Sequence, residues 1–245
     1  MRVLVTGGAN GLGAGLVRHF AAAGHDVAFA DLDADAGARL TEETGALFVL
    51  ADVGVFSDNV AAVEQCVERF GGLDAVCLNA GVAGQTTVGA DFDAARYRRA
   101  MQVNLDGVVY GFNAALPALS GRGSVLITSS LAGIAPALDV YYSAAKHALI
   151  GLTRSFAMRL HQDGVRVNAI CPGFVDTRAI ATVREALTTH WLALADPAEI
   201  AAVAADILEA GETGQVWQVQ AGRRAELMDF PRVTLSRDDE AGQHP

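Results

Sequence analysis

The stretch VLVTGGANGLG, residues 3–13, decides the fold. Four residues typical of a buried strand lead into a glycine-rich turn, and a segment of helical periodicity follows over 11–23. Glycine lets the backbone turn sharply and approach a ligand, while the free N–H groups and dipole of a helix N-terminus favour a phosphate. We therefore predict a strand, a turn and a helix that bind a pyrophosphate, with contacts from Gly7, Asn10, Gly11, Leu12 and Gly13.

The alternation of short apolar runs and longer helical segments continues along the chain, as expected for a parallel sheet covered by helices. The predicted strands cover residues 3–6, 26–30, 46–50, 75–79, 124–129, 165–171 and 215–219. The predicted helices cover 11–23, 34–44, 56–70, 92–116, 141–162 and 196–210. This pattern predicts an α/β fold, a single Rossmann-type doubly wound domain whose seven-stranded parallel sheet has the order 3-2-1-4-5-6-7, with helices on both faces.

Two segments do not follow this alternation. Residues 175–195 lie between the sixth strand and the last helix, where α/β sheets place elements that cover a ligand, so we predict a lid there. Residues 223–245 follow the last strand and end in a polar run, which predicts a C-terminal tail. The chain is expected to form a single domain over residues 1–222.

Composition argues against several classes of partner. The 245 residues have a formal net charge of −10, which disfavours binding to nucleic acid or to an anionic membrane surface. No apolar run reaches the roughly 18 residues that span a bilayer, so we expect a cytoplasmic protein. Three widely separated cysteines indicate reduced core thiols, and we expect no metal site.

Asp31 stands at the end of the second predicted strand, 18 residues beyond Gly13. A carboxylate there can accept hydrogen bonds from the adenosine ribose hydroxyls and would repel the 2′-phosphate of NADP. Neither Asn10 nor Leu32, which are expected beside that ribose, is a cation that could receive the phosphate. We therefore predict NAD as the cofactor; the alternative is that Asp31 caps the helix beginning near Asp33.

Further motifs add a resemblance to a known family. TGGANGLG together with YSAAK, residues 142–146, resembles the short-form short-chain dehydrogenase/reductase family. ADV (51–53), NAG (79–81), NLDG (104–107), SSLAG (129–133) and PGFVDT (172–177) follow the family order, so the resemblance covers about residues 1–220. It implies adenine contacts from Asp52 and Val53, support of the cofactor from Asn79, Ala80 and Gly81, and nicotinamide contacts from Pro172, Gly173, Val175 and Thr177.

Helical phase selects one of two adjacent tyrosines. Residues four apart share a helix face, so Tyr142 meets Lys146, whereas Tyr141 pairs by spacing with Ala145. The family resemblance makes Tyr142 the general acid/base and has Lys146 bind the nicotinamide ribose. We expect Lys146 and the positive nicotinamide ring to lower the pKa of the Tyr142 phenol, which is normally about 10.

The resemblance supplies two further candidate catalytic residues. Ser130 matches the family serine that hydrogen-bonds the substrate oxygen, although 12 residues separate it from Tyr142 where the family more often has 13. Ser129 would restore that spacing, but Ser130 keeps the Ser-x-x-Gly pattern. Asn104 resembles the family residue that holds a water in a proton relay, the alternative being an exposed helix asparagine.

These residues predict an NAD(H)-dependent oxidoreductase that interconverts a secondary alcohol and a ketone by hydride transfer. The apolar residues near the predicted site favour a hydrophobic small-molecule substrate. The alternatives are a non-catalytic dinucleotide-binding sensor or interaction protein, and an epimerase or dehydratase of the same superfamily. The resemblance also implies a homo-oligomer, a tetramer or a dimer, with helices 92–116 and 141–162 at one interface.

Overall fold

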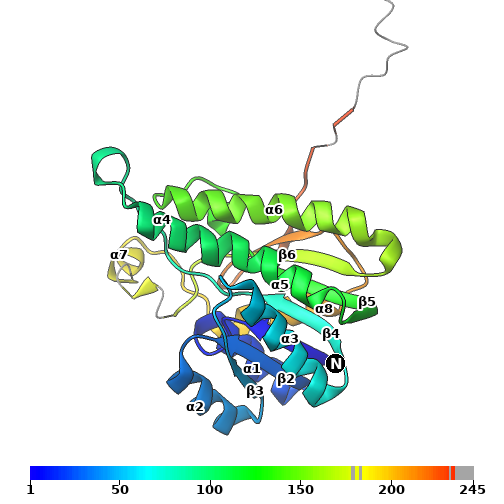
Figure 1. The fold of residues 1–245 in the computed structure, drawn as a ribbon. Helices are drawn as coiled ribbons and strands as arrows, with labels where there is room; N and C mark the ends of the chain where they lie inside the picture. Colours follow the sequence, from blue (N-terminus) through cyan, green and yellow to red (C-terminus); the bar gives the residue numbers. More distant parts are fainter. Residues whose placement is uncertain (178–179, 182–183, 232, 235–245) are drawn as a thin grey trace, which may run out of the picture.

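The structure of the protein, a computed structural model, describes residues 1–177, 180–181, 184–231 and 233–234. A sheet runs through its centre with helices on both faces (Figure 1). Its first seven strands are parallel, in the spatial order β3-β2-β1-β4-β5-β6-β7. They are β1 (Arg2–Thr6), β2 (Asp26–Asp31), β3 (Leu47–Leu50), β4 (Leu73–Leu78), β5 (Leu119–Thr128), β6 (Arg166–Pro172) and β7 (Val216–Val219). The predicted order of the seven strands is confirmed.

The sheet contains one strand more than the sequence predicts. β8 (Glu226–Leu227) pairs antiparallel with β7, and the N–H of Met228 donates to the carbonyl of Val216 at 2.8 Å. Phe230 then packs beneath the guanidinium of Arg154, whose Cζ lies 4.2 Å from the ring centroid. A two-residue strand has no apolar run that a sequence pattern can detect, so the start of the predicted tail is part of the sheet.

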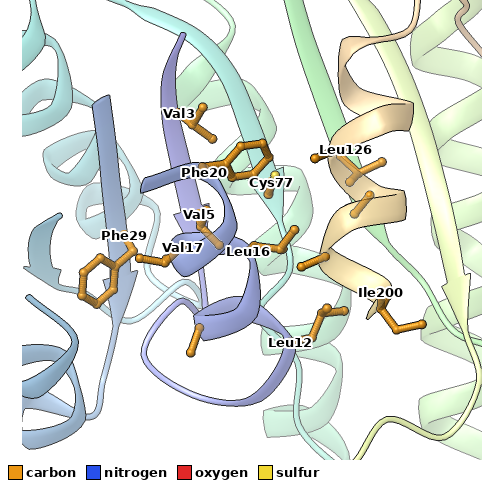
Figure 2. Close-up of a cluster of buried hydrophobic side chains, with 14 of the residues drawn as sticks. Val3, Val5, Leu12, Leu16, Val17, Phe20, Phe29, Cys77, Leu126 and Ile200 are labelled. Atoms are coloured by element: carbon orange, nitrogen blue, oxygen red, sulfur yellow. The ribbon is translucent and has the colours of Figure 1, made fainter. Parts of the chain in front are cut away.

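The two large hydrophobic cores form because successive strand side chains point to opposite faces. Val3 and Val5 face α1 (Gly11–Ala22), α2 (Ala34–Thr44) and α8 (Pro197–Glu209), and Figure 2 shows this core around Leu16 and Phe20. Leu4 faces the opposite core, which is closed by α3 (Phe56–Phe70), α5 (Gly107–Ala115) and α6 (Val140–Leu160). This alternation explains why the central strands are apolar throughout, since both of their faces are buried.

The predicted helix 92–116 is interrupted. α4 (Ala94–Met101) passes into a π-helical turn, η2 (Gln102–Asp106), before α5 begins, and a short 3₁₀ turn, η1 (Gly89–Asp91), precedes α4. A π turn inserts one residue into the helical ladder and is often found at functional sites. Helical periodicity does not reveal such an insertion, because the residues on either side keep an apolar face.

The predicted lid contains α7 (Arg184–Thr189), and its ends meet where Val175 bridges Ala195. Residues 178–179 and 182–183 of this segment lie outside the described residues. The remaining short elements are η3 (Leu131–Gly133) and η4 (His161–Asp163).

Two further findings concern the described part of the chain. Within it, no helix is both long and apolar enough to cross a bilayer. The three cysteines, Cys66, Cys77 and Cys171, are buried and unpaired, as the sequence predicts.

Candidate active site

A cavity of about 760 Å³ opens beyond the carboxyl ends of the parallel strands, where α/β sheets bind ligands. Every predicted site residue except Asn104 lines it. The glycine turn and Asp31 lie among its lining residues together with Ser130 and Tyr142, so one continuous space joins the predicted cofactor and substrate sites.

The glycine-rich turn between β1 and α1 has no space for a side chain at Gly7 or Gly13. Gly7 has a φ of +63°, and a Cβ there would lie 2.7 Å from the Cα of Ala80. A Cβ on Gly13 would collide with the carbonyl oxygen of Gly7. The side-chain amide of Asn79 donates to the carbonyls of Thr6 and Gly7, both at 3.2 Å. The turn is therefore pinned to the segment after β4, and its glycines leave room for a phosphate.

Asp31 uses its carboxylate to organise the same turn. Its oxygens accept from the backbone N–H groups of Ala9 at 2.9 Å and Asp33 at 3.0 Å. α2 is capped by Asp33, whose side chain accepts from Ala36 N–H, so the alternative that Asp31 is the helix cap is wrong. A carboxylate has about four acceptor positions, which leaves Asp31 able to bind ribose hydroxyls.

Asp52 has a partner that the sequence did not reveal. The guanidinium of Arg99 donates to both of its oxygens, at 2.9 and 3.2 Å, and Gly54 N–H donates at 2.9 Å. Both Asp52 and Arg99 line the cavity beside Val53. Because Arg99 comes from α4, 47 residues further along the chain, no local pattern predicts this pair.

The two serines after β5 have different surroundings. Ser129 is buried, and its hydroxyl donates to the backbone carbonyl of Lys146 at 2.9 Å. Both serines line the cavity. Ser130 accepts from Ala132 N–H at 3.1 Å, and its hydrogen bond to Tyr142 lowers the pKa of that phenol. This geometry favours Ser130 over Ser129 as the residue that meets a substrate oxygen.

Tyr142 and Lys146 lie on one face of α6, as their spacing predicts. The Lys146 ammonium is 5.5 Å from the centroid of the Tyr142 ring and donates to the carbonyl of Thr128 at 2.8 Å. Lys146 is 2% exposed, and burial lowers its pKa to about 8.

The pKa of Tyr142 moves in the direction opposite to the expected one. Burial of the phenol raises its pKa, the hydrogen bond with Ser130 lowers it, and the nearby Asp139 and Cys171 raise it further. The expected lowering by Lys146 is not among the causes of this shift, in which loss of hydration, which penalises the phenolate, is the largest.

Tyr141 takes no part in the cavity. Its ring lies 5.4 Å from that of Phe92 and 5.1 Å from that of Tyr97, measured between centroids. The three rings form an aromatic cluster between α6 and the start of α4, with edge-on and tilted contacts that such rings favour.

Asn104 lies behind the cavity wall, in the π turn, and is fully buried. Its amide nitrogen donates to the carbonyls of Val82 at 2.8 Å and Ala100 at 2.9 Å, and its oxygen accepts from Val82 N–H at 3.1 Å. The alternative of an exposed helix asparagine is therefore wrong. One lone pair of Oδ1 accepts from Val82, and the other is available to a water. The water-holding role of Asn104 stays a prediction.

The substrate end of the cavity is mostly apolar. Its walls come from the segment after β4, from the loop between β5 and α6, and from the segment after β6, and they include Val82, Ala83, Leu131, Ala135, Pro136, Ala137, Phe174 and Ile180. Asp139 adds a carboxylate to this lining. Within the described residues, no three His, Cys, Asp or Glu side chains gather as a metal site would require.

Comparison with known proteins places the chain in a family. Residues 1–188 match the family model described as short chain dehydrogenase. The chain belongs to the short-chain dehydrogenase family. It is 35% identical over 248 residues to a 3-alpha-(or 20-beta)-hydroxysteroid dehydrogenase of Mycobacterium tuberculosis, a match that covers 97% of this chain and 95% of that protein.

Two other proteins are similar to this chain, one in sequence over part of its length and one in structure. Sex determination protein tasselseed-2 of Zea mays is 41% identical over 184 residues, covering 71% of this short-chain dehydrogenase but 55% of the maize protein. The crystal structure of a 3-ketoacyl-(acyl-carrier-protein) reductase from Brucella melitensis complexed with NADH superposes with a TM-score of 0.82 and 27% identity, covering 90% of this chain and 97% of the other. The relatives support an oxidoreductase that acts on alcohols, with a nicotinamide dinucleotide as its type of cofactor.

Proposed function

We propose that this short-chain dehydrogenase uses NAD(H) to interconvert a hydrophobic secondary alcohol and its ketone. The observation that carries the proposal is one cavity lined by Asp31, the last residue of β2, and by Ser130, Tyr142 and Lys146. The tight glycine turn and the spare acceptor positions on Asp31 fit a dinucleotide with an unmodified adenosine ribose.

NAD is preferred over NADP in this proposal because of charge. The Asp31 carboxylate lies at the end of β2, where it would meet a 2′-phosphate with like charge. Leu32 beside it is exposed and uncharged, so it offers that phosphate no compensating cation. The cofactor, when bound, supplies the hydride acceptor for alcohol oxidation and the hydride donor for ketone reduction.

Tyr142 is proposed to move the proton. In alcohol oxidation its oxygen takes the hydroxyl proton of the substrate, and in ketone reduction its hydroxyl returns a proton to the substrate oxygen. A raised pKa keeps the phenol protonated at neutral pH, which suits reduction. Oxidation requires the phenolate and is therefore expected to speed up as pH rises.

Ser130 and Lys146 are proposed to support this proton transfer. The Ser130 hydroxyl, in reach of Tyr142, can donate to the substrate oxygen and stabilise the negative charge that develops there. Lys146 is anchored through Thr128 with its ammonium near the Tyr142 ring, so its remaining N–H groups are available to ribose hydroxyls.

The proposal is tested by turnover with matched tyrosine variants. NAD and NADP are each offered with a panel of alicyclic, aromatic and steroid alcohols, and NADH formation is followed by absorbance. Tyr142→Phe is expected to lose at least about a hundredfold in kcat while still binding NADH, because general acid/base groups contribute about 10²- to 10⁴-fold. Tyr141→Phe is the control and should retain activity. Near-normal turnover by Tyr142→Phe would refute the mechanism, and NADH binding without turnover across the panel would favour the non-catalytic alternative.

We also propose that the protein assembles as a homo-oligomer, a tetramer or a dimer, through the helical segments 92–116 and 141–162. Apolar side chains are exposed on and beside these helices, with Val140 42%, Met158 80% and Phe56 48% exposed. Light scattering at micromolar concentration tests this assembly, and a monomer would contradict it.

A further inference from the structure

Asp139, the residue before α6, binds two separate parts of the chain with one carboxylate. Its oxygens accept from the N–H of Tyr142 at 3.0 Å, of Gly84 at 2.6 Å and of Gln85 at 3.1 Å. The first of these donors is in the opening turn of α6, and the other two lie in the segment after β4, more than fifty residues away in sequence. Asp139 also lines the substrate end of the cavity.

This arrangement exceeds what helix capping requires. Asp196 caps α8 by accepting from Ala198 N–H at 2.7 Å, which is the ordinary role of an N-cap side chain. A serine can perform that role with one oxygen. Oδ1 of Asp139 accepts from Gln85 N–H as well as from Tyr142 N–H, and Oδ2 accepts from Gly84 N–H. Hydrogen bonds to a carboxylate are about twice as strong as neutral ones.

The same contact explains a glycine outside the cofactor turn. A Cβ on Gly84 would lie 2.5 Å from Oδ1 of Asp139 and 3.0 Å from Oδ2. Gly84 is buried although its φ does not require glycine, so close approach of the carboxylate is the reason for the missing side chain. The close approach of Gly84 and Asp139 therefore requires a glycine at one position and places a carboxylate at the other.

Residues 82–85 are held at their other end by Asn104. Its side-chain amide bonds both the N–H and the C=O of Val82. Gln85 continues the restraint, because its buried side chain accepts from Asp93 N–H at 3.0 Å and donates to Asp93 C=O at 2.7 Å. Val82, which Asn104 holds, and Ala83, which follows it, line the cavity.

We propose that Asp139 is a positioning residue that ties residues 82–85 to the first turn of α6 and thereby sets the width of the substrate end of the cavity beside Tyr142. This inference rests on the proposed function, because the wall it positions is the wall of the proposed substrate site. It assigns substrate fit to a residue that bonds backbone groups, while Tyr142 and Ser130 meet the substrate oxygen. Gly84→Ala tests the fit with the Asp139 carboxylate, which raises the pKa of Tyr142, still present.

The test compares two variants on opposite sides of the contact with one control. Asp139→Ser keeps a helix cap but cannot hold the loop, and Gly84→Ala pushes the carboxylate away. Asp196→Ser changes the cap of α8, whose carboxylate accepts from Ala198 N–H and not from the N–H groups of Gly84 and Gln85. We expect Asp139→Ser and Gly84→Ala to raise KM for the alcohol about tenfold and to change kcat less than about threefold. A tenfold change in affinity corresponds to the free energy of about one hydrogen bond, which is the loss that a displaced wall would cause. Asp196→Ser should leave KM unchanged.

A second measurement does not depend on turnover. Amide hydrogen exchange in the NADH-free protein should show that Gly84 and Gln85 exchange at least about tenfold faster in Asp139→Ser than in the unaltered protein. Equal protection in the two proteins would overturn the tie even if no substrate has been found. Faster exchange together with an unchanged KM would overturn the link to substrate fit, whereas absence of turnover in the unaltered protein concerns the proposed function alone.

Discussion

The substitution Lys146→Met should stabilise the folded protein at neutral pH, and it should abolish activity. Lys146 is 2% exposed, and burial lowers its pKa from 10.5 to about 8. Each pKa unit is worth about 1.4 kcal/mol, so holding the ammonium in the folded protein costs about 3 kcal/mol at pH 7. Methionine has a similar length and no charge, which removes this cost.

The substitution also removes one hydrogen bond. The carbonyl of Thr128 accepts from Lys146 at 2.8 Å, and a buried carbonyl without its donor costs about 1–2 kcal/mol. The net expectation at pH 7 is a free energy of unfolding about 1–2 kcal/mol higher for Lys146→Met. The difference depends on pH, because between pH 8 and pH 10.5 the unfolded chain binds the lysine proton and the folded chain does not. The unaltered protein therefore gains stability through this range, and the advantage of the variant disappears.

Urea unfolding of both proteins at pH 7 and pH 10, at equal protein concentration, measures this difference. Taking the difference between the two proteins removes the titration of the cysteines and other tyrosines, which they share. Turnover should fall in the variant at both pH values. A variant less stable than the unaltered protein at pH 7, or a difference in stability that is the same at both pH values, would refute the reasoning.

Three further substitutions test the cofactor turn and the chain after β7. Asp31→Ser should lower the kcat/KM preference for NAD over NADP about tenfold, because a like charge near the 2′-phosphate is removed; an unchanged ratio would contradict the role of Asp31. Gly13→Ala should weaken NADH binding and lower the unfolding free energy by about 1–3 kcal/mol, since its Cβ meets the Gly7 carbonyl; binding is measured by NADH fluorescence, and normal affinity would argue against the tight turn. Phe230→Ala should cost about 1–2 kcal/mol through lost packing on Arg154 without changing NADH affinity, and equal urea midpoints would show that this packing contributes nothing.

The amino-acid sequence by itself determines the seven parallel strands of the sheet and the core of the site. Strand and helix periods predict seven parallel strands, and the right-handed connections of a doubly wound fold predict their spatial order. Tyr142 is separated from Tyr141 by helical phase, and the glycines of the first turn are recognised by a steric requirement that acts within a few residues. These features are local, so local patterns reveal them.

The tertiary structure alone decided the features that join distant segments. Asp139 meets Gly84 across 55 residues and Arg99 meets Asp52 across 47, and no spacing rule connects residues that far apart. The direction of the Tyr142 pKa also required the fold, because desolvation depends on every element packed around the phenol. Spacing along the chain places side chains on a face of a helix or strand, but burial and partners are set only when the elements pack together.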